Sequence, residues 1–199
     1  MASPRAVVSV AGSRSLPPEA SALVAAVCRS LMASGRSLAV GCCVGVDAAV
    51  LGCAVAPSGR GVPAARVSCL CAFGPGGAGA GPASAVSAVE AFAAAGGSVA
   101  WWAGGPSSVP LSARLVARTR AVVAQASAGC VVFFASPVSR GSLLAASCAV
   151  SRGLPVFAFP VGFAGRLLPP LGAGAWVPIS GSGVWAGAFR WVSGQAGIF

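Results

Sequence analysis

The feature that most constrains the fold is a pair of apolar strands, joined by a helix, in the second half of the chain. Residues 129 to 136 read GCVVFFAS, with no polar residue inside the run, and a second apolar run, VFAFP, ends at residue 160. A strand that is apolar throughout is typical of a parallel sheet with helices over both of its faces. Because strands and helices alternate from residue 6 onward, we predict an α/β fold with an open, mostly parallel sheet.

The length of the chain, 199 residues, predicts one domain of ordinary size. Its regular part spans residues 1–162, and residues 163–199, rich in tryptophan and glycine, are expected to form an irregular cap or a short closing hairpin of the same domain. Strands are predicted at residues 37–43 and 98–104, among others. The stretch 74–84, GPGGAGAGPAS, is expected to be a loop that needs a partner to become ordered.

The charge of the chain is strongly positive. All thirteen basic residues are arginine, the acids are Glu19, Asp47 and Glu90, and the formal net charge is +10. A basic chain of this kind attracts phosphate backbones, nucleotides or other anions. The alternative is that the charge serves solubility alone, and the composition does not decide between the two.

Two apolar stretches, 37–56 and 83–103, raise the question of a membrane span. Each carries a carboxylate near its middle and turn residues, so neither is an unbroken apolar run of about 18 residues. The amino terminus has only a short apolar run before Gly12, which is unlike a signal peptide. We therefore expect a cytoplasmic protein without a membrane partner.

Eight cysteines could indicate a metal site or disulfides. Histidine is absent, and the CC and CxC spacings match no zinc signature, so we expect neither a metal nor a cofactor. Most of the cysteines lie inside apolar runs, where a buried thiol behaves as a small hydrophobic group.

Polar clusters follow three of the predicted strands, where ligands bind in open α/β sheets. The clusters are Gly12-Ser13-Arg14, the stretch from Gly41 through Gly45 to Asp47, and Ser139-Arg140-Gly141-Ser142. In each, glycine lets the backbone approach an anion, and the helix that follows offers free N–H groups. The last cluster is predicted to cradle a phosphate.

Other roles remain open for two of these residues. Ser142 could simply cap its helix, with Gly141 turning the chain, and Asp47 could either hydrogen-bond a ribose hydroxyl or cap the helix at 48–55. On the predicted helix at 110–127, Arg114 and Arg118 are four residues apart and share a face, whereas Arg120 points elsewhere.

The order of these motifs resembles the Rossmann-like SLOG superfamily, which contains the bacterial DNA-processing proteins of natural transformation (DprA) and the LOG phosphoribohydrolases. The segments VVSVAGSRS, VGCCVGVDAAVLGCAV and RLVARTRAVVAQASAGCVVFFASPVSRGSLLAASCAVSRGLPVFAFP carry the resemblance, over about residues 6–162. The DNA-processing branch is the more similar one locally. The hydrolases have a PGGxGTxxE motif, but the matching segment here is SRGSLLAAS, which lacks the glutamate.

The resemblance implies a ligand site made of residues that match the family's motifs. These are Gly12, Ser13 and Arg14; Gly41, Gly45 and Asp47; Arg118, Thr119 and Arg120; and Arg140, Gly141 and Ser142. Threonine stands at 119 where the family's Arg-Asn-Arg has asparagine, and it can still donate a hydrogen bond to phosphate.

The leading hypothesis is a non-catalytic protein that binds single-stranded DNA, with Arg14, Arg118, Arg120 and Arg140 on phosphates. Trp101 and Trp102 could stack on bases or could simply pack in the core. The alternative is a module that senses or sequesters a small phosphorylated nucleotide. A weaker one is a nucleotide phosphoribohydrolase with Glu90 as a displaced acid. A homo-oligomer that pairs through the alanine-rich face of residues 83–95 is also predicted.

Overall fold

The computed structural model describes residues 5–56 and 61–194 of the chain. Its strands are β1 (Val7–Gly12), β2 (Ser37–Val40), β3 (Val67–Leu70), β4 (Ser98–Ala100), β5 (Gly129–Phe134), β6 (Val156–Pro160), β7 (Gly174–Pro178) and β8 (Phe189–Ser193). Its α-helices are α1 (Ala20–Ala33), α2 (Val46–Val55), α3 (Ala83–Ala94), α4 (Leu111–Gln125) and α5 (Arg140–Ser151). No helix in these residues is both long and apolar enough to cross a membrane.

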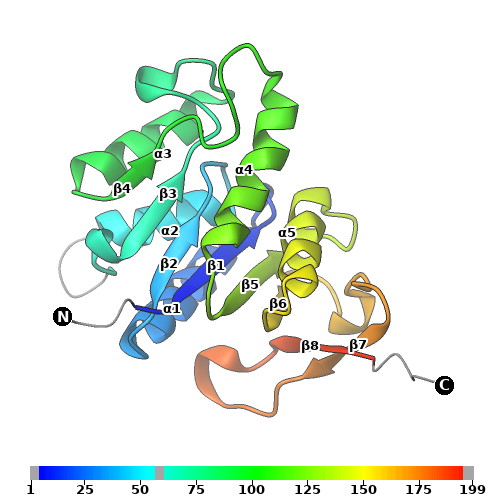
Figure 1. Cartoon of the computed structure of the whole chain (residues 1–199). Helices are drawn as coiled ribbons and strands as arrows, with labels where there is room; N and C mark the ends of the chain where they lie inside the picture. Colours follow the sequence, from blue (N-terminus) through cyan, green and yellow to red (C-terminus); the bar gives the residue numbers. More distant parts are fainter. Residues whose placement is uncertain (1–4, 57–60, 195–199) are drawn as a thin grey trace.

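The strands form one mixed sheet in the order β4-β3-β2-β1-β5-β6-β8-β7 (Figure 1). The first six of these are parallel, and β8 and β7 continue the sheet in antiparallel fashion. The order reverses at β1, because the chain runs outward from β1 to β4 and then returns through α4 to β5 on the other side of β1. The predicted α/β fold with a mostly parallel sheet is confirmed.

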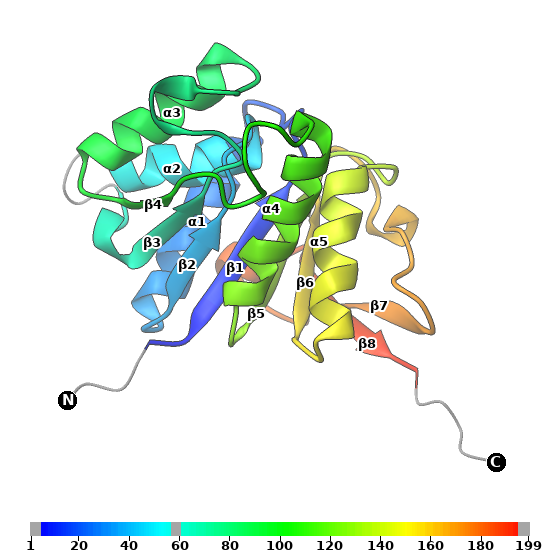
Figure 2. The ribbon, with the colours of Figure 1, turned by 45° about the horizontal axis from the view of Figure 1, so that its top comes forward.

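The helices lie in two layers, one on each face of the sheet. Helices α1, α2 and α3 pack side by side on one face, and α4 and α5 pack together on the other (Figure 1 and Figure 2). This arrangement explains why β5 has no polar residue. Val131 and Phe133 join the core beneath α1 and α2, whereas Cys130, Val132 and Phe134 join the core beneath α5.

The carboxy-terminal segment adds a hairpin and covers part of the sheet. In the β7–β8 hairpin, the rings of Trp176 and Trp191 meet edge to face at 5.2 Å. The segment between these strands folds back over the face that carries α1. There the ring of Trp185 contacts the rings of Phe157 and Phe159 at 5.8 and 5.7 Å, and its indole N–H donates to the hydroxyl of Ser30 at 3.1 Å.

β2 and β4 end three or more residues earlier than the sequence predicts. β2 stops at Val40 instead of residue 43, because the chain turns at Gly41 to bring the backbone N–H of Cys43 to the carboxylate of Asp47. β4 stops at Ala100 instead of residue 104, because Trp102 takes a left-handed backbone conformation with φ of 56°. Both apolar runs continue past the point where the backbone leaves the sheet.

Candidate functional site

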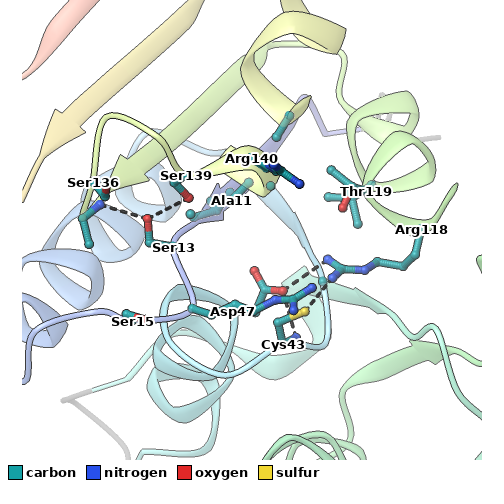
Figure 3. A pocket seen from close by; sticks show the side chains of 18 of the residues that line it. Ala11, Ser13, Ser15, Cys43, Asp47, Arg118, Thr119, Ser136, Ser139 and Arg140 are labelled. Carbon is teal, nitrogen blue, oxygen red and sulfur yellow. Dashed lines mark hydrogen bonds and ion pairs between the residues drawn. The ribbon is translucent and has the colours of Figure 1, made fainter. Parts of the chain in front are cut away.

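A cavity of about 450 Å³ opens at the carboxyl ends of β1, β2 and β5 (Figure 3). Its walls come from residues 10–15, 41–47, 118–123 and 135–145, which belong to the three strand ends and to one face of α4. β1 and β5 are neighbours at the point where the strand order reverses, which is where open α/β sheets bind their ligands. The geometry thus brings residues of the three polar clusters together around one cavity.

Three serine hydroxyls hold the loops after β1 and β5 against each other. The hydroxyl of Ser13 lies 3.0 Å from that of Ser139 and 3.4 Å from that of Ser142, and Ser139 and Ser142 are 2.8 Å apart. Ser13 also accepts a hydrogen bond from the backbone N–H of Ala135 at 2.9 Å. Because Ser13 and Ser142 are almost completely buried, these bonds fix the distance between the two loops.

Glycines allow the backbone to approach closely around these loops. A β-carbon at Gly12 would lie 2.5 Å from a methyl carbon of Val46, and one at Gly45 would lie 2.3 Å from the carbonyl oxygen of Ser13. Gly45 also has a φ of 77°, which side chains rarely adopt. The start of α2 is thus pressed against the end of β1. The first N–H of α2, that of Val46, donates to the carbonyl oxygen of Ser13 at 3.2 Å.

The floor of the cavity holds a buried ion pair. The guanidinium of Arg118, on α4, lies 3.2 Å from Oδ2 of Asp47, on α2, and both side chains are less than a tenth exposed. The same carboxylate oxygen accepts the backbone N–H of Cys43 at 2.9 Å, and a β-carbon at Gly41 would overlap the guanidinium of Arg118. Only glycine at position 41 leaves room for the ion pair.

Burial and charge act against each other on this pair. Burial raises the pKa of the Asp47 carboxyl above its usual range, although Arg118 and the Cys43 amide oppose that shift. Burial lowers the pKa of Arg118, but Asp47 and the neighbouring cysteines together raise it above its usual value. The Nε of Arg118 has no hydrogen-bond partner in the part of the chain that the structure describes.

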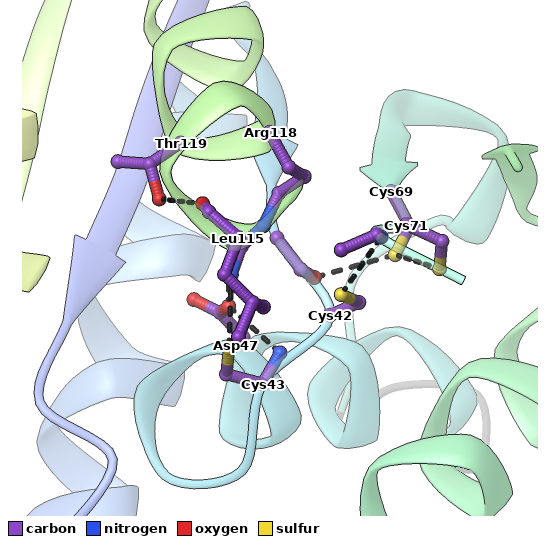
Figure 4. A network of polar contacts seen from close by, with 10 residues as sticks. Cys42, Cys43, Asp47, Cys69, Cys71, Leu115, Arg118 and Thr119 are labelled. Carbon is purple, nitrogen blue, oxygen red and sulfur yellow. Dashed lines mark hydrogen bonds and ion pairs between the residues drawn. The ribbon is translucent and has the colours of Figure 1, made fainter. Parts of the chain in front are cut away.

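A group of thiols lies behind the ion pair (Figure 4). Arg118 donates from Nη2 to the sulfur of Cys43 at 2.8 Å. A hydrogen bond with Cys42, together with burial, raises the pKa of the Cys43 thiol. Next to it, the sulfurs of Cys69 and Cys71 lie 3.8 Å apart. Cys43 is half-buried and lines the cavity.

The rim of the cavity carries the exposed charge. Arg14 follows β1 and Arg140 begins α5, and both side chains are exposed to solvent while lining the cavity. Val138, in the loop between β5 and α5, is 82% exposed. The site therefore has cations at its mouth and a carboxylate at its floor.

The structure places nine of the twelve predicted site residues in the cavity wall: Gly12, Ser13, Arg14, Gly41, Asp47, Arg118, Thr119, Arg140 and Gly141. The other three do not line it. Gly45 forms the turn into α2, Arg120 is exposed elsewhere on α4, and Ser142 is buried in the serine cluster.

The alternative roles as helix caps are wrong for Ser142 and Asp47. The N-cap positions are Ser139 for α5 and Gly45 for α2, and neither Ser142 nor Asp47 caps its own helix. The hydroxyl of Thr119 donates to the carbonyl of Leu115 at 2.9 Å, within α4. Sequence reasoning missed Ser139 and Cys43 as individual site residues. Ser139 carried a signal, since it stands directly before the predicted helix.

Arg114, also on α4, binds the neighbouring loops and does not line the cavity. It donates to the carbonyl oxygens of Val109 at 2.9 Å and Gly79 at 2.8 Å, and to that of Ala72, and its guanidinium lies over the Trp102 ring at 5.2 Å. Trp101 packs on Phe73 at the edge of the core. Glu90 is exposed on α3 and does not line the cavity. No three metal-ligating side chains of the described residues come together in a possible metal site.

Solved structures of two proteins are similar to this fold. DNA processing protein A from Helicobacter pylori is 18% identical with a TM-score of 0.59, over 78% of this chain and 65% of that one. DNA processing protein A (DprA) from Streptococcus pneumoniae is 22% identical with a TM-score of 0.58, over 82% and 53%. At these identities the match shows a shared fold, and the matched part spans less than two thirds of either protein.

The sequence itself also matches a family. A comparison with curated proteins found no match. The family described as DNA recombination-mediator protein A, in contrast, matches residues 2–167, which is most of the chain and includes every residue of the cavity. This match confirms the resemblance to the DNA-processing branch. The chain therefore belongs to the DNA recombination-mediator protein A family.

Proposed function

We propose that this protein binds single-stranded DNA without reacting with it, and that the phosphates lie across the mouth of the cavity. The observation that carries the proposal is the placement of Arg14 and Arg140. They come from two loops that the serine cluster joins, both are exposed, and both line the cavity together with Gly12 and Gly141. Two exposed arginines at the mouth of one cavity are the kind of side chain that contacts DNA phosphates.

Three further facts support the proposal. The net charge of +10 favours a polyanion, and the family takes its description from DNA recombination. The structure of the Helicobacter pylori protein is described as showing a single-stranded DNA binding mode. The proposed role includes a cytoplasmic location.

The proposal assigns the phosphate contacts to fewer arginines than the sequence predicts. Arg118 is buried and paired with Asp47, and Arg120 points away from the cavity, so Arg14 and Arg140 are the arginines left to face a strand. The amides around Gly12 and Gly141 add neutral donors. Among the described residues of the wall, Asp47 is the one carboxylate, and no second group stands by for proton transfer.

Fluorescence polarisation with a labelled 15-mer at several salt concentrations tests the proposal. Wild-type affinity is expected to fall with salt, by roughly 0.7 in log K per log salt for each phosphate contact. The double variant Arg14→Ala/Arg140→Ala removes two contacts, so its slope should be smaller by about 1.4.

The matched control is Arg5→Ala/Arg190→Ala. These two arginines are also exposed but lie near the start of β1 and on β8, away from the cavity, so this variant loses the same charge. If the control loses as much affinity and slope as the cavity variant, binding is a matter of net charge and the assignment is wrong. If the wild type shows no salt-dependent binding, the proposal as a whole is contradicted.

A second candidate is binding of a small phosphorylated nucleotide. The volume of the cavity, about 450 Å³, lies within the range of small-molecule sites, roughly 300–1,000 Å³. Mononucleotides added as competitors separate the two: displacement of the 15-mer by a nucleoside monophosphate at low micromolar concentration favours the second candidate. Hydrolysis of such a nucleotide with Glu90 as the acid has no support from the geometry, because Glu90 lies outside the cavity wall.

Self-association through α3 remains part of the proposal. Ala91 and Ala94 are small, exposed residues on this helix, at the end of the sheet where β4 is the edge strand. Ala91→Arg should therefore lower the sedimentation coefficient to that of a monomer. A monomeric wild type would contradict the prediction.

A further inference from the structure

A second cavity, of about 320 Å³, lies at the amino ends of β1, β5 and β6, on the edge of the sheet opposite the first cavity. It opens between the carboxy-terminal half of α1, the sheet and the segment between β7 and β8, which reaches from the hairpin toward α1 (Figure 1). Its volume is at the lower end of the range of small-molecule sites, roughly 300–1,000 Å³. Two of its wall residues, Ile179 and Trp185, come after residue 167, where the family match ends. The match therefore does not describe this cavity.

The walls of the second cavity are apolar and partly aromatic. Val8, Leu31 and Val131 line it as buried side chains of the core beneath α1. The rings of Phe157 and Trp185 also line it, with their centroids 5.8 Å apart, and each is partly exposed. Because the indole N–H of Trp185 already donates to a serine hydroxyl of α1, this ring offers the cavity apolar surface. The hydrocarbon part of a ligand would gain free energy by leaving water here.

The one charged side chain among the described residues of this wall is that of Arg36, which directly precedes β2. Its Nη1 donates to the hydroxyl of Ser34 at 2.5 Å, and its other guanidinium N–H groups have no hydrogen-bond partner in the part of the chain that the structure describes. In that part of the chain, the one ion pair joins Arg118 to Asp47, in the first cavity. No carboxylate of these residues therefore compensates the charge of Arg36.

A carboxylate suits this arrangement better than a phosphate does. A guanidinium presents paired N–H groups that match the two oxygens of a carboxylate, and its single charge balances a single negative charge. A phosphate dianion on one arginine would keep an uncompensated charge beside apolar walls, which is costly. The cavity is thus suited to a monoanion with an apolar body.

We propose that the second cavity binds a small apolar monocarboxylate, whose carboxylate pairs with Arg36 and whose hydrocarbon body lies against Leu31, Phe157 and Trp185. The bound acid contacts α1, the sheet and the segment between β7 and β8 together, so it holds that segment against the rest of the fold. The two cavities share no residue among those described, and this site is therefore independent of DNA binding.

The sharpest ligand pair is 4-phenylbutyrate against 4-phenylbutyramide at pH 7.5 and low salt. The two molecules have the same shape and differ in the charge of the head group. Isothermal titration calorimetry should show about tenfold tighter binding of the acid to the wild type, because a hydrogen bond between two charged groups replaces one to a neutral amide. Octanoate should also bind and raise Tm, whereas acetate, which lacks the apolar body, should not.

Arg36→Gln tests the pairing, with Arg120→Gln as the matched control. Both variants lose one positive charge, but Arg120 is exposed on α4, outside both cavities. Arg120→Gln should keep the tenfold preference for the acid, and Arg36→Gln should reduce it to less than about twofold. Arg36→Lys, which keeps the charge, should keep part of the preference.

The indole N–H signals of the wild type locate the ligand without a change in the wall. In a two-dimensional ¹H–¹⁵N NMR spectrum, 4-phenylbutyrate should shift the signal of Trp185, identified by its absence in Trp185→Phe. The signal of Trp176, whose N–H donates to the carbonyl of Pro169 outside this cavity, should stay in place. This measurement still decides the location if circular dichroism shows that Arg36→Gln does not fold.

The outcomes separate this inference from the proposed function. Equal affinity of the wild type for acid and amide overturns the inference, and so does a preference that survives in Arg36→Gln or a Trp185 signal that does not move. No saturable binding of 4-phenylbutyrate or octanoate at up to about 10 mM also overturns it. If the DNA 15-mer displaces the acid, or if Arg14→Ala/Arg140→Ala loses it, the acid lies in the first cavity. That result contradicts the inference and leaves the proposed function intact.

Discussion

The buried ion pair between Asp47 and Arg118 predicts that removing either partner destabilises the fold, and that the two variants differ in how their stability depends on pH. The two charged groups are 3.2 Å apart and each side chain is less than a tenth exposed. At an effective dielectric constant of about 20, their attraction is about 5 kcal/mol, and the cost of removing both from water opposes it. Removing one partner leaves the other charge buried, which costs about 3–5 kcal/mol.

The two single variants differ in what the remaining partner can do. In Asp47→Asn the guanidinium of Arg118 stays charged at any ordinary pH, so this site adds no pH dependence to the unfolding free energy of the variant itself. In Arg118→Met the carboxyl can take up a proton. Burial already raises the pKa of Asp47 with the arginine present, and without it the pKa rises further.

The sign of the pH dependence follows from proton uptake. In Arg118→Met the folded pKa of Asp47 lies above the unfolded one, so the folded state holds more protons in the interval between them. Stability therefore falls as the pH rises through that interval, by up to about 1.4 kcal/mol per pH unit. The loss should approach that of Asp47→Asn at pH 8 and be clearly smaller at pH 5.

Urea unfolding under reducing conditions, followed by circular dichroism at both pH values, measures these losses. The double variant Asp47→Asn/Arg118→Met should lose less than the two single variants together, with a coupling free energy of about 2 kcal/mol or more. Single losses below about 1 kcal/mol, or a loss in Arg118→Met that is the same at both pH values, would refute the reasoning, because they would show the pair to be hydrated.

Two further predictions concern the loops and the thiols. Gly45→Ala should lower the free energy of unfolding by more than about 2 kcal/mol, because φ is 77° and the new β-carbon would lie 2.3 Å from the Ser13 carbonyl oxygen; Gly76→Ala, with φ of 66° and open space, should cost only about 1 kcal/mol in the same urea unfolding assay. Burial raises the pKa of the Cys130 thiol to about 12, so peptide mapping after brief maleimide treatment at pH 8 should find Cys148 labelled before Cys130. Similar losses in the two glycine variants, or early labelling of Cys130, would contradict these expectations.

The sheet was predictable because its signal is local. In β5 every position is apolar, since residues 130 to 134 alternate between two cores, and a short apolar run bounded by turn residues is typical of a strand covered on both faces. The polar clusters after β1, β2 and β5 were also predictable as neighbours, because parallel strands end at one edge. The features that depend only on chain order and strand direction could thus be predicted from the sequence.

The ion pair between Arg118 and Asp47 could not be predicted from the sequence in the same way. Arg118 and Asp47 are 71 residues apart, and the sequence offers both as ligand-binding groups. Their contact depends on how α4 is rotated against α2. One signal was present: Arg114, Arg118 and Val122 recur every four residues on one face of α4, and all three are buried. An arginine on the apolar face of a helix indicates an internal partner.

The loops and the tail depend on single long-range contacts. The glycine-rich stretch after β3 was expected to need a partner for order, and Arg114 is that partner through its bond to the carbonyl of Gly79. No local pattern indicates that a side chain from α4 reaches this loop. Likewise, the tail forms β7 and β8 because β8 pairs with the edge of β6. No local sequence pattern in the tail indicates this pairing.

The place of Trp185 has a consequence for where the protein can be divided. The family match ends at residue 167, before β7, Trp185 and β8. A fragment cut there would expose the rings of Phe157 and Phe159 and leave the edge of β6 without a paired strand, which invites aggregation. The segment that matches the family is thus shorter than the folded unit. A protein made for expression should therefore include the chain through β8.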